Sequence, residues 1–265
     1  MRRTAFDDEL DAAQAKWRYR PPRDLLQGRV ILVTGAGGGI GAVAAATYAR
    51  FGANVVLLGR TQAALEEVHD DIAAATATDP TIAACDLSRV DSAALAPLSE
   101  QLLAHYGKLD GILHNAGALG PRVPIEHYPA ADWEAVLRVN LTAPFLLTQA
   151  LLPALGAAPD ASVVFTSSSV GRRARAYWGA YAVSKFGIEA LSQLLADEHE
   201  AASKIRFNTL NPGATRTAMR AAAYPAENPQ NVQTPLEKID VYLYLIGPES
   251  RDCTGRQLDA MTWTR

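Results

Sequence analysis

A tyrosine and a lysine one helical turn apart stand out in the sequence. Tyr181 and Lys185 are four residues apart, so they share one face if this stretch is helical. A free tyrosine has a pKa of about 10, and a neighbouring ammonium stabilises the phenolate and lowers that value. The pair could therefore transfer a proton near neutral pH. Chance also produces such pairs, so this interpretation depends on the residues around it.

Two polar residues could complete this chemistry. Ser168 ends a predicted strand, and its hydroxyl could donate to a carbonyl oxygen as charge develops there. The alternative is that Ser168 only caps the next turn. Asn140 lies in an uncharged predicted helix, where its amide would either satisfy the core or order a chain of waters.

A glycine-rich segment follows the first predicted strand and reads Thr-Gly-Ala-Gly-Gly-Gly-Ile-Gly from Thr34 onward. Glycines let the chain turn sharply and let backbone N–H groups approach a pyrophosphate at a helix N-terminus. The spacing differs from the G-x-G-x-x-G fingerprint, but its place between a strand and a helix predicts a dinucleotide site. We expect Gly35, Gly39, Ile40 and Gly41 to form that site, with a flexible turn as the alternative.

The end of the second predicted strand bears on which dinucleotide binds. An NAD site normally has an acidic residue there that binds the ribose 2′-OH. This chain instead has Gly59 followed by Arg60, whose guanidinium suits a 2′-phosphate. We therefore expect NADP(H) to be preferred over NAD(H), the alternative being a solvated arginine.

Two further strand ends are expected to contact the cofactor. Asp86 and Leu87 follow the third predicted strand, where a carboxylate can accept a hydrogen bond from an adenine amino group. Asn115 and Gly117 follow the fourth, where small residues let the chain pass close to a bound molecule. Ligands of parallel sheets bind beyond the carboxyl ends of the strands, so these positions are expected to converge.

From Arg29 onward, short apolar runs alternate with helical patterns. Continuous apolar strands that alternate with helices indicate a parallel sheet covered on both faces. The predicted fold class is α/β, a single doubly wound Rossmann-type domain with about seven strands and helices on both faces. We expect strands at residues 30–33, 54–58, 81–84, 111–114, 162–166, 205–210 and 255–259. We expect helices at residues 40–51, 62–75, 92–106, 130–155 (bent near Pro144), 177–202 and 235–246.

The N-terminal residues differ from the rest of the chain. Residues 1–27 are expected to be an extension with a charged helix over 7–19, and we favour a frayed end over a docking arm. Residues 28–265 are expected to form the Rossmann-type domain. Within it, the Pro- and Asn-containing segment 212–233 is expected to be a loop.

Composition excludes several classes of protein. The chain of 265 residues has a net charge of −3, so it lacks the basic excess typical of nucleic-acid or anionic-membrane binding. Its two cysteines and five histidines have no metal-ligand spacing, which predicts no metal and suits the reducing cytoplasm. The uncharged run from Val139 to Pro159 contains polar residues and prolines, so we interpret it as a buried helix rather than a membrane span.

Together these motifs resemble the short-chain dehydrogenase/reductase family, and within it the bacterial YciK-like oxidoreductases. The resemblance covers about residues 28–260. It includes a further segment with Pro212, Gly213, Thr215 and Thr217, which would also contact the cofactor. The other matching residues, in chain order, are Thr34, Gly35, Gly39, Gly41, Asn115, Ala116, Gly117, Asn140, Ser168, Tyr181 and Lys185.

The resemblance implies a role for each matching residue. Tyr181 would transfer the proton, and Lys185 would lower its pKa and bind the nicotinamide ribose. Ser168 would hold the substrate oxygen, and Asn140 would anchor a water that relays protons to the lysine. The segment from 212 to 217 would pass beside the nicotinamide amide. The cofactor would exchange hydride with a small-molecule carbonyl or secondary alcohol.

The resemblance also implies an assembly and contains one departure. Family members form homodimers or homotetramers, which here would pack through the helices near residues 131–155 and 177–202. His114 stands where the family usually has asparagine, and we expect it to support the sheet near the cofactor. Residues 1–20 have no counterpart in the family core.

Five arginines lie near the predicted mouth of the site, and 212–233 corresponds to the family's substrate flap. An anionic carbonyl compound would explain this charge, although we favour a solvated rim or one occupied by cofactor phosphates. The five are Arg172, Arg173, Arg175, Arg216 and Arg220.

Two other classes of function compete with an oxidoreductase. One is a nucleotide-sensing protein that kept the fold without physiological turnover, and the complete proton-transfer set argues against it. The other is a nucleotide-dependent methyltransferase, which shares a similar glycine loop. Arg60 and the Tyr181–Lys185 pair argue against that class.

Overall fold

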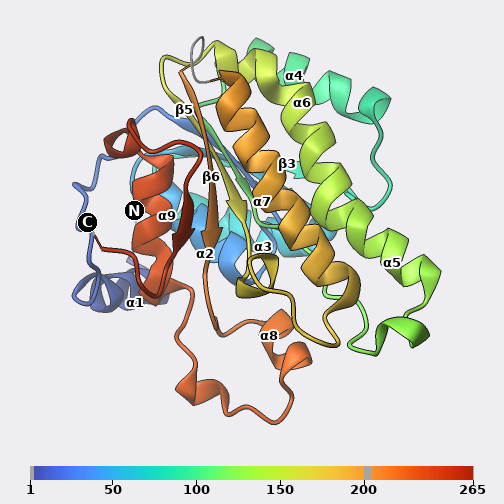
Figure 1. The fold of residues 1–265 in the computed structure, drawn as a ribbon. Coiled ribbons are helices and arrows are strands. Elements are labelled where there is room, and N and C mark those ends of the chain that lie inside the picture. The colour runs from blue at the N-terminus through green and yellow to red at the C-terminus, as the bar shows by residue number, and fades with distance from the viewer. Residues whose placement is uncertain (1–2, 200–203, 265) are drawn as a thin grey trace.

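Seven parallel strands form one sheet in the computed structural model, which describes residues 3–199 and 204–264 (Figure 1). The strand order is β3-β2-β1-β4-β5-β6-β7, so successive connections reverse direction between β1 and β4. The strands are β1 Val30–Thr34, β2 Asn54–Gly59, β3 Thr81–Ala84, β4 Gly111–His114, β5 Ala161–Thr166, β6 Ile205–Asn211 and β7 Gln257–Asp259. This confirms the predicted doubly wound α/β fold.

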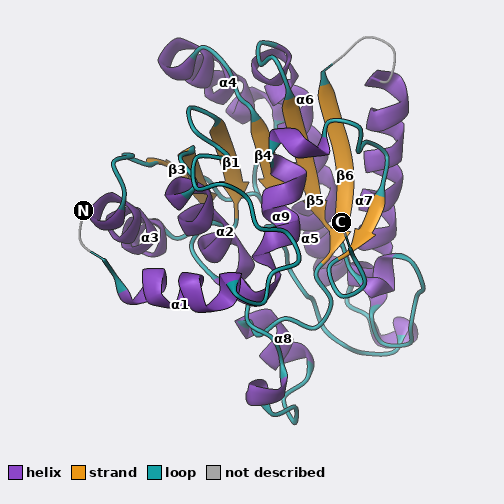
Figure 2. Ribbon diagram, turned by 90° about the vertical axis from the view of Figure 1, so that its left-hand side faces the viewer, coloured by secondary structure: helices purple, strands orange, loops and turns teal. Residues whose placement is uncertain are grey.

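Helices cover both faces of the sheet (Figure 2). One core cluster joins α2, α3 and α9 to the sheet, and the other joins α4, α6 and α7 to it. The helices are α1 Ala5–Gln14, α2 Gly39–Arg50, α3 Gln62–Ala75, α4 Ser92–Tyr106, α5 Ala130–Leu137, α6 Ala143–Gly156, α7 Gly179–His199, α8 Ala218–Ala223 and α9 Ile239–Ile246.

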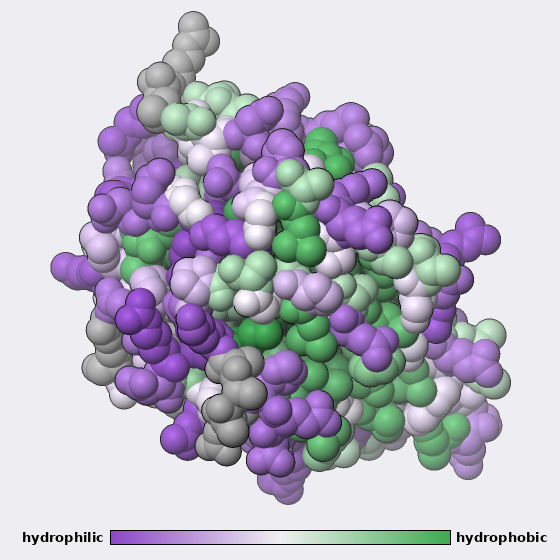
Figure 3. Space-filling model, turned by 90° about the horizontal axis from the view of Figure 1, so that it is seen from above, coloured by the Kyte–Doolittle hydropathy of each residue, from purple (hydrophilic) through white to green (hydrophobic). Residues whose placement is uncertain are grey.

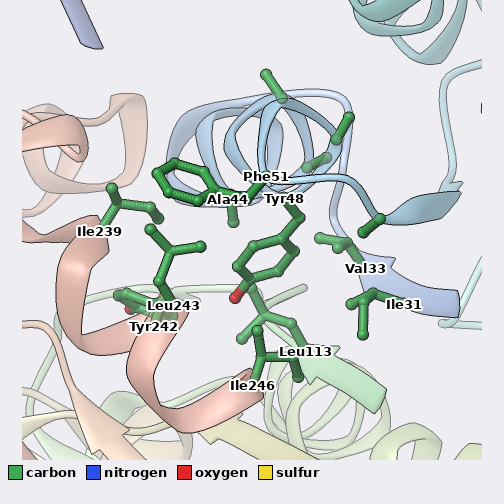
Figure 4. Close-up of a cluster of buried hydrophobic side chains, with 14 of the residues drawn as sticks. Ile31, Val33, Ala44, Tyr48, Phe51, Leu113, Ile239, Tyr242, Leu243 and Ile246 are labelled. Atoms are coloured by element: carbon green, nitrogen blue, oxygen red, sulfur yellow. The ribbon is translucent and has the colours of Figure 1, made fainter. Parts of the chain in front are cut away.

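The central strands are buried on both sides, which is why they read as continuous apolar runs. In β1, Ile31 and Val33 belong to the cluster with α2 and α9, whereas Leu32 belongs to the opposite cluster. Figure 4 shows the first cluster, where Tyr48 of α2 lies among side chains of the sheet and of α9, including Ile246. These two layers fix the strand ends that carry the polar residues.

The long helix predicted over 130–155 is interrupted. Between α5 and α6, residues Arg138–Thr142 form a π-helical turn, and Pro144 lies in the first turn of α6. Proline is tolerated in a first turn, so the irregularity falls just before it. By length and composition the stretch Ala130–Gly156 could cross a membrane, but Leu147 packs in the core as the sequence predicts for a buried helix.

The N-terminal segment packs on the domain, so the frayed-end interpretation is wrong for residues 3–27. Leu10 and Trp17 are 1% and 4% exposed and join the core cluster of α2 and α9. Arg50 of α2 also donates to the carboxylate of Asp7 at 2.5 Å. The many charges in this segment concealed the narrow apolar stripe that anchors it.

Several predicted boundaries also differ. The helix predicted over 7–19 is observed as α1 at Ala5–Gln14, and the one predicted over 235–246 as α9 at Ile239–Ile246. The loop over 212–233 contains the short helix α8, where Thr217 caps the first turn by accepting from the Arg220 amide at 3.2 Å. A helix of this length shows no periodic pattern in the sequence. The helix predicted over 177–202 begins at Gly179, and residues 200–202 lie outside the described residues.

Candidate active site

A cleft of about 660 Å³ opens at the carboxyl edge of the sheet. The parallel strands bring their last residues to this edge, as expected. Every predicted site residue lines the cleft except Gly41 and Asn140. The lining residues are Gly35, Gly39, Ile40, Arg60, Asp86, Leu87, Asn115, Gly117, Ser168, Tyr181, Lys185, Pro212, Gly213, Thr215 and Thr217.

The glycine loop is shaped to receive an anion. Gly35 and Gly39 have φ angles of 68° and 54°, which favour glycine. A Cβ at Gly41 would lie 2.2 Å from the carbonyl oxygen of Gly35, so the loop packs against Gly41 too closely for any side chain there. The N-cap of α2 is Gly38, which has no side chain to bond the first amides of the helix. The space beside it is open, since a Cβ there would meet nothing within 4 Å. The first amides of α2 can therefore bind a pyrophosphate, so these residues fit a dinucleotide.

Thr34 joins the glycine loop to the loop after β4. Its Oγ1 accepts hydrogen bonds from the amides of Asn115 and Ala116, both at 3.0 Å. A Cβ at Gly35 would lie 3.0 Å from the Cα of Ala116, so the two loops are in contact. Thr34 belongs to the glycine motif in the sequence, but its partners come from a loop about 80 residues away.

A carboxylate and a guanidinium line the end of the cleft near β2 and β3. The carboxylate of Asp86 accepts from the hydroxyl and amide of Ser88 at 2.8 and 3.0 Å. These hydrogen bonds, with a smaller effect from Arg60, hold the pKa of Asp86 below its usual value. Arg60 is exposed on the same wall. This end can therefore accept from an amino group and bind a phosphate.

The predicted proton-transfer residues meet at the other end of the cleft. Ser168 follows β5, and Tyr181 lies on the first turn of α7. Burial raises the pKa of the Tyr181 phenol, while a hydrogen bond with the hydroxyl of Ser168 acts to lower it. The two hydroxyls can thus share one substrate oxygen.

Lys185 lies one turn further along α7 and is 5% exposed. Its Nζ donates to the carbonyl oxygen of Thr166 at 2.7 Å and lies 5.6 Å from the centre of the Tyr181 ring. Burial lowers the pKa of Lys185 to about 8, and the nearby Glu189 carboxylate opposes that shift. The site therefore keeps a cation close to the phenol near neutral pH.

Asn140 supports the site from behind. It lies on the π-helical turn, and its side chain accepts from the amide of Ala118 at 2.7 Å and donates to the carbonyl oxygen of the same residue at 2.9 Å. A third hydrogen bond, of 3.0 Å, reaches the hydroxyl of Ser184 on α7. The Asn140 amide thus ties the loop after β4 to the helix that carries Tyr181.

Glu189 is a site residue that sequence reasoning missed. It is 4% exposed, and its carboxylate accepts from the hydroxyls of Ser167 and Thr209 and from Arg172 Nε at 3.3 Å. The signal available in the sequence was its spacing, because a residue four positions after Lys185 lies on the same face of a helix. The carboxylate links α7 to the ends of β5 and β6.

The predicted arginine rim is largely engaged by the protein itself. Arg172 bonds Glu189 and the carbonyl oxygen of Leu258, and Arg220 forms two hydrogen bonds of 2.7 Å with Glu227. Arg216 donates to backbone carbonyls of the flap. This favours an internally paired or solvated rim over a rim dedicated to an anionic substrate.

An aromatic wall missed by the sequence lies beside Tyr181. The ring of Trp178 is 5.6 Å from that of Tyr181 and 6.1 Å from that of Tyr224 on the flap. The Arg122 guanidinium lies over both rings, at 4.6 Å from Trp178 and 5.1 Å from Tyr224. The three rings are tilted to one another, and guanidinium groups already lie against Trp178 and Tyr224.

In the described part of the chain, no group of three or more His, Cys, Asp or Glu side chains is placed to hold a metal ion. His114 stacks on Phe165 at 4.8 Å, and its Nε2 lies 2.9 Å from the hydroxyl of Thr148. Burial lowers the pKa of His114 to about 3, so the ring is neutral. Its place in the sheet matches the supporting role expected for it.

Known proteins resemble the chain over most of its length. Residues 29–228 match the short chain dehydrogenase family. An uncharacterised oxidoreductase, YciK of Escherichia coli K12, is 49% identical over 91% of this chain and 95% of its own. A short chain dehydrogenase from Escherichia coli CFT073, solved in complex with NADPH, is 49% identical, with a TM-score of 0.88 over 91% of this chain and 99% of its own.

A named enzyme is also among the relatives. D-threitol dehydrogenase of Mycolicibacterium smegmatis is 30% identical over 75% of each chain. These relatives support an enzyme that acts on CH–OH groups with NAD(P) as acceptor, and they contradict the methyltransferase alternative. The fold, the cleft and these matches lead to one conclusion: the chain belongs to the short-chain dehydrogenase/reductase family.

Proposed function

We propose that the protein is an NADP(H)-dependent carbonyl reductase and alcohol dehydrogenase in which Tyr181 is the general acid and base. The observation that carries the proposal is the convergence of Ser168, Tyr181 and Lys185 at one end of a cleft whose other end fits a dinucleotide. The nicotinamide, when bound, supplies or accepts the hydride. The protein contributes geometry, proton transfer and electrostatics.

In the reduction direction, the hydroxyls of Ser168 and Tyr181 bind the carbonyl oxygen, and Tyr181 gives its proton to that oxygen as charge develops. The Lys185 ammonium stabilises the phenolate that results. Asn140 holds the loop after β4 against α7 and, on the family's pattern, anchors the water that returns a proton toward Lys185. Oxidation reverses these steps.

The preference for NADP(H) over NAD(H) rests on β2. The strand ends at Gly59, so no acidic side chain occupies the place that would bind a ribose 2′-OH. Arg60 lines the cleft directly after it and suits a 2′-phosphate. Complexes of similar proteins with NADP and NADPH support the binding of NADP(H).

We propose a cytoplasmic homodimer or homotetramer that packs through α6 and α7. Exposed apolar side chains on these helices include Phe145, Val183, Phe186 and Leu194. Seen from the end opposite the cleft, hydrophobic residues gather on the side of the molecule that these helices form (Figure 3). Residues 28–265 would be the catalytic domain and 1–27 its docked extension.

The test is oxidation of NADPH by the purified protein with a panel of aldehydes and ketones. We expect turnover with at least one carbonyl compound, and a loss of at least about 100-fold in kcat for Tyr181→Phe with NADPH affinity retained. A Tyr181→Phe variant that keeps wild-type turnover would refute the mechanism. A protein that binds NADPH but turns over no compound would favour the nucleotide-sensing alternative.

A further inference from the structure

A buried lysine outside the predicted site contacts the segment that follows β6. Lys238 ends the short 3₁₀ helix Leu236–Lys238, directly before α9, and is only 3% exposed. Its Nζ donates to the carbonyl oxygen of Pro212 at 2.9 Å, to that of Ala214, and to the hydroxyl of Thr215 at 3.3 Å. All three donors of the ammonium are thus used on one short loop.

That loop forms a wall of the cleft. Pro212, Gly213 and Thr215 line it, and a Cβ at Gly39 of the glycine loop would lie 3.4 Å from Thr217, just beyond. The carbonyl oxygens of Pro212 and Ala214 accept from Lys238. Lys238 is thus one anchor of this wall, and the other is Asn211 of β6, whose Oδ1 accepts from the Gly213 amide at 3.0 Å.

The backbone around Lys238 is itself held by the N-terminal segment. Trp17 Nε1 donates to the carbonyl oxygen of Leu236 at 2.8 Å, and Lys16 pairs with Glu237 at 3.3 Å. The carboxylate of Asp240 accepts from the amide of Arg18 at 2.9 Å. The lysine thus projects from a fixed base toward the loop.

We propose that Lys238 is a positioning residue that holds the Pro212–Thr215 loop in the shape that receives the cofactor, an inference that rests on the proposed NADP(H) function. A charged ammonium offers three donors to three oxygen acceptors, whereas a neutral amine has only two, so one of the three hydrogen bonds from Lys238 is lost. Cofactor affinity should therefore fall when Lys238 loses its proton.

The charge of Lys238 depends on its surroundings. Burial lowers its pKa to about 8. Asp259 after β7 and Glu237 before α9 act to raise that pKa, and Arg220 of α8 acts to lower it. The ammonium is present below this value and lost above it, so the clamp weakens as pH rises through about 8. Lys185, in the same cleft, also titrates near 8.

The experiment compares NADPH dissociation constants, measured by cofactor fluorescence at pH 7 and 9.5, for wild type, Lys238→Met and the exposed-site control Lys204→Met. We expect Lys238→Met to weaken binding about tenfold at pH 7 and less than about threefold at pH 9.5, where wild type has also lost the ammonium. Lys185 is present in all three proteins, so its titration cancels in the ratio. Lys204→Met should match wild type.

Equal affinities of wild type and Lys238→Met at pH 7, or a ratio that stays constant with pH, would overturn the proposal. If Lys238→Met does not fold, amide exchange of wild type without cofactor replaces it. We then expect protection of residues 213–217, relative to β6, to fall between pH 7 and 9.5, and unchanged protection would contradict the clamp. A wild-type protein that never binds NADPH would refute the proposed function. The exchange experiment needs no cofactor, so it would still test whether Lys238 holds the loop.

Discussion

Lys185 donates a hydrogen bond of 2.7 Å to the carbonyl oxygen of Thr166, the last residue of β5. This bond holds the ammonium at the carboxyl end of the sheet, 5.6 Å from the centre of the Tyr181 ring. Burial raises the pKa of that phenol. In the proposed mechanism, the Lys185 ammonium would oppose this shift by stabilising the phenolate.

Removal of this cation should change the pH dependence of catalysis. In alcohol oxidation Tyr181 acts as its phenolate, so the rate rises with pH through the pKa of the phenol. We expect Lys185→Met to move that rise upward by about one to two pH units and to lower kcat at pH 7 about 100-fold. A pH–rate profile measures both effects. An unshifted profile would show that the lysine does not act on Tyr181.

Loss of the buried carboxylate should destabilise the protein. Glu189→Gln leaves Arg172 without its charged partner and removes the group that opposes the lowering of the Lys185 pKa. We expect the free energy of unfolding to fall by about 2–4 kcal/mol, measured by urea denaturation. Glu198→Gln, at an exposed position on the same helix, is the matched control and should change it by less than about 0.5 kcal/mol.

Arg60 should decide between the two cofactors. We expect Arg60→Ala to weaken NADPH binding about tenfold or more and NADH binding less than about twofold, because only NADPH carries the 2′-phosphate. Fluorescence titration with each cofactor gives the ratio. Arg89→Ala removes another exposed arginine near Asp86 and should leave the ratio unchanged. Equal losses for both cofactors would place Arg60 away from the 2′ position.

The N-terminal helix should contribute to global stability. Leu10 is 1% exposed, so Leu10→Ala should cost about 2–4 kcal/mol in unfolding free energy through lost burial and a residual cavity. The neighbouring exposed Glu9→Ala should change it by less than about 0.5 kcal/mol. Calorimetry or urea denaturation measures both. A stability insensitive to Leu10→Ala would mean that α1 is detached in solution.

The strand–helix alternation and most of the candidate site were predictable from the sequence. Strands buried on both faces are apolar throughout, so runs such as Val30–Thr34 can be recognised as strands from the sequence. Parallel strands carry the residues that follow them to one edge of the sheet, so the sequence alone predicts that Gly35, Asn115 and Ser168 lie close together. Local spacing was sufficient for Tyr181 and Lys185 because one helix sets their geometry.

Tertiary structure alone decided the contacts between segments distant in the chain. Glu189 becomes a site residue only because β5 and β6 bring Ser167 and Thr209 to it, and Lys238 only because α9 begins beside the loop after β6. The docking of the N-terminal segment depends on the hydrogen bond from Trp17 to the carbonyl oxygen of Leu236, which lies more than 200 residues away in the sequence. Hydrogen bonds of this kind leave no periodic trace in a sequence, since each depends on the packing that places two unrelated segments side by side.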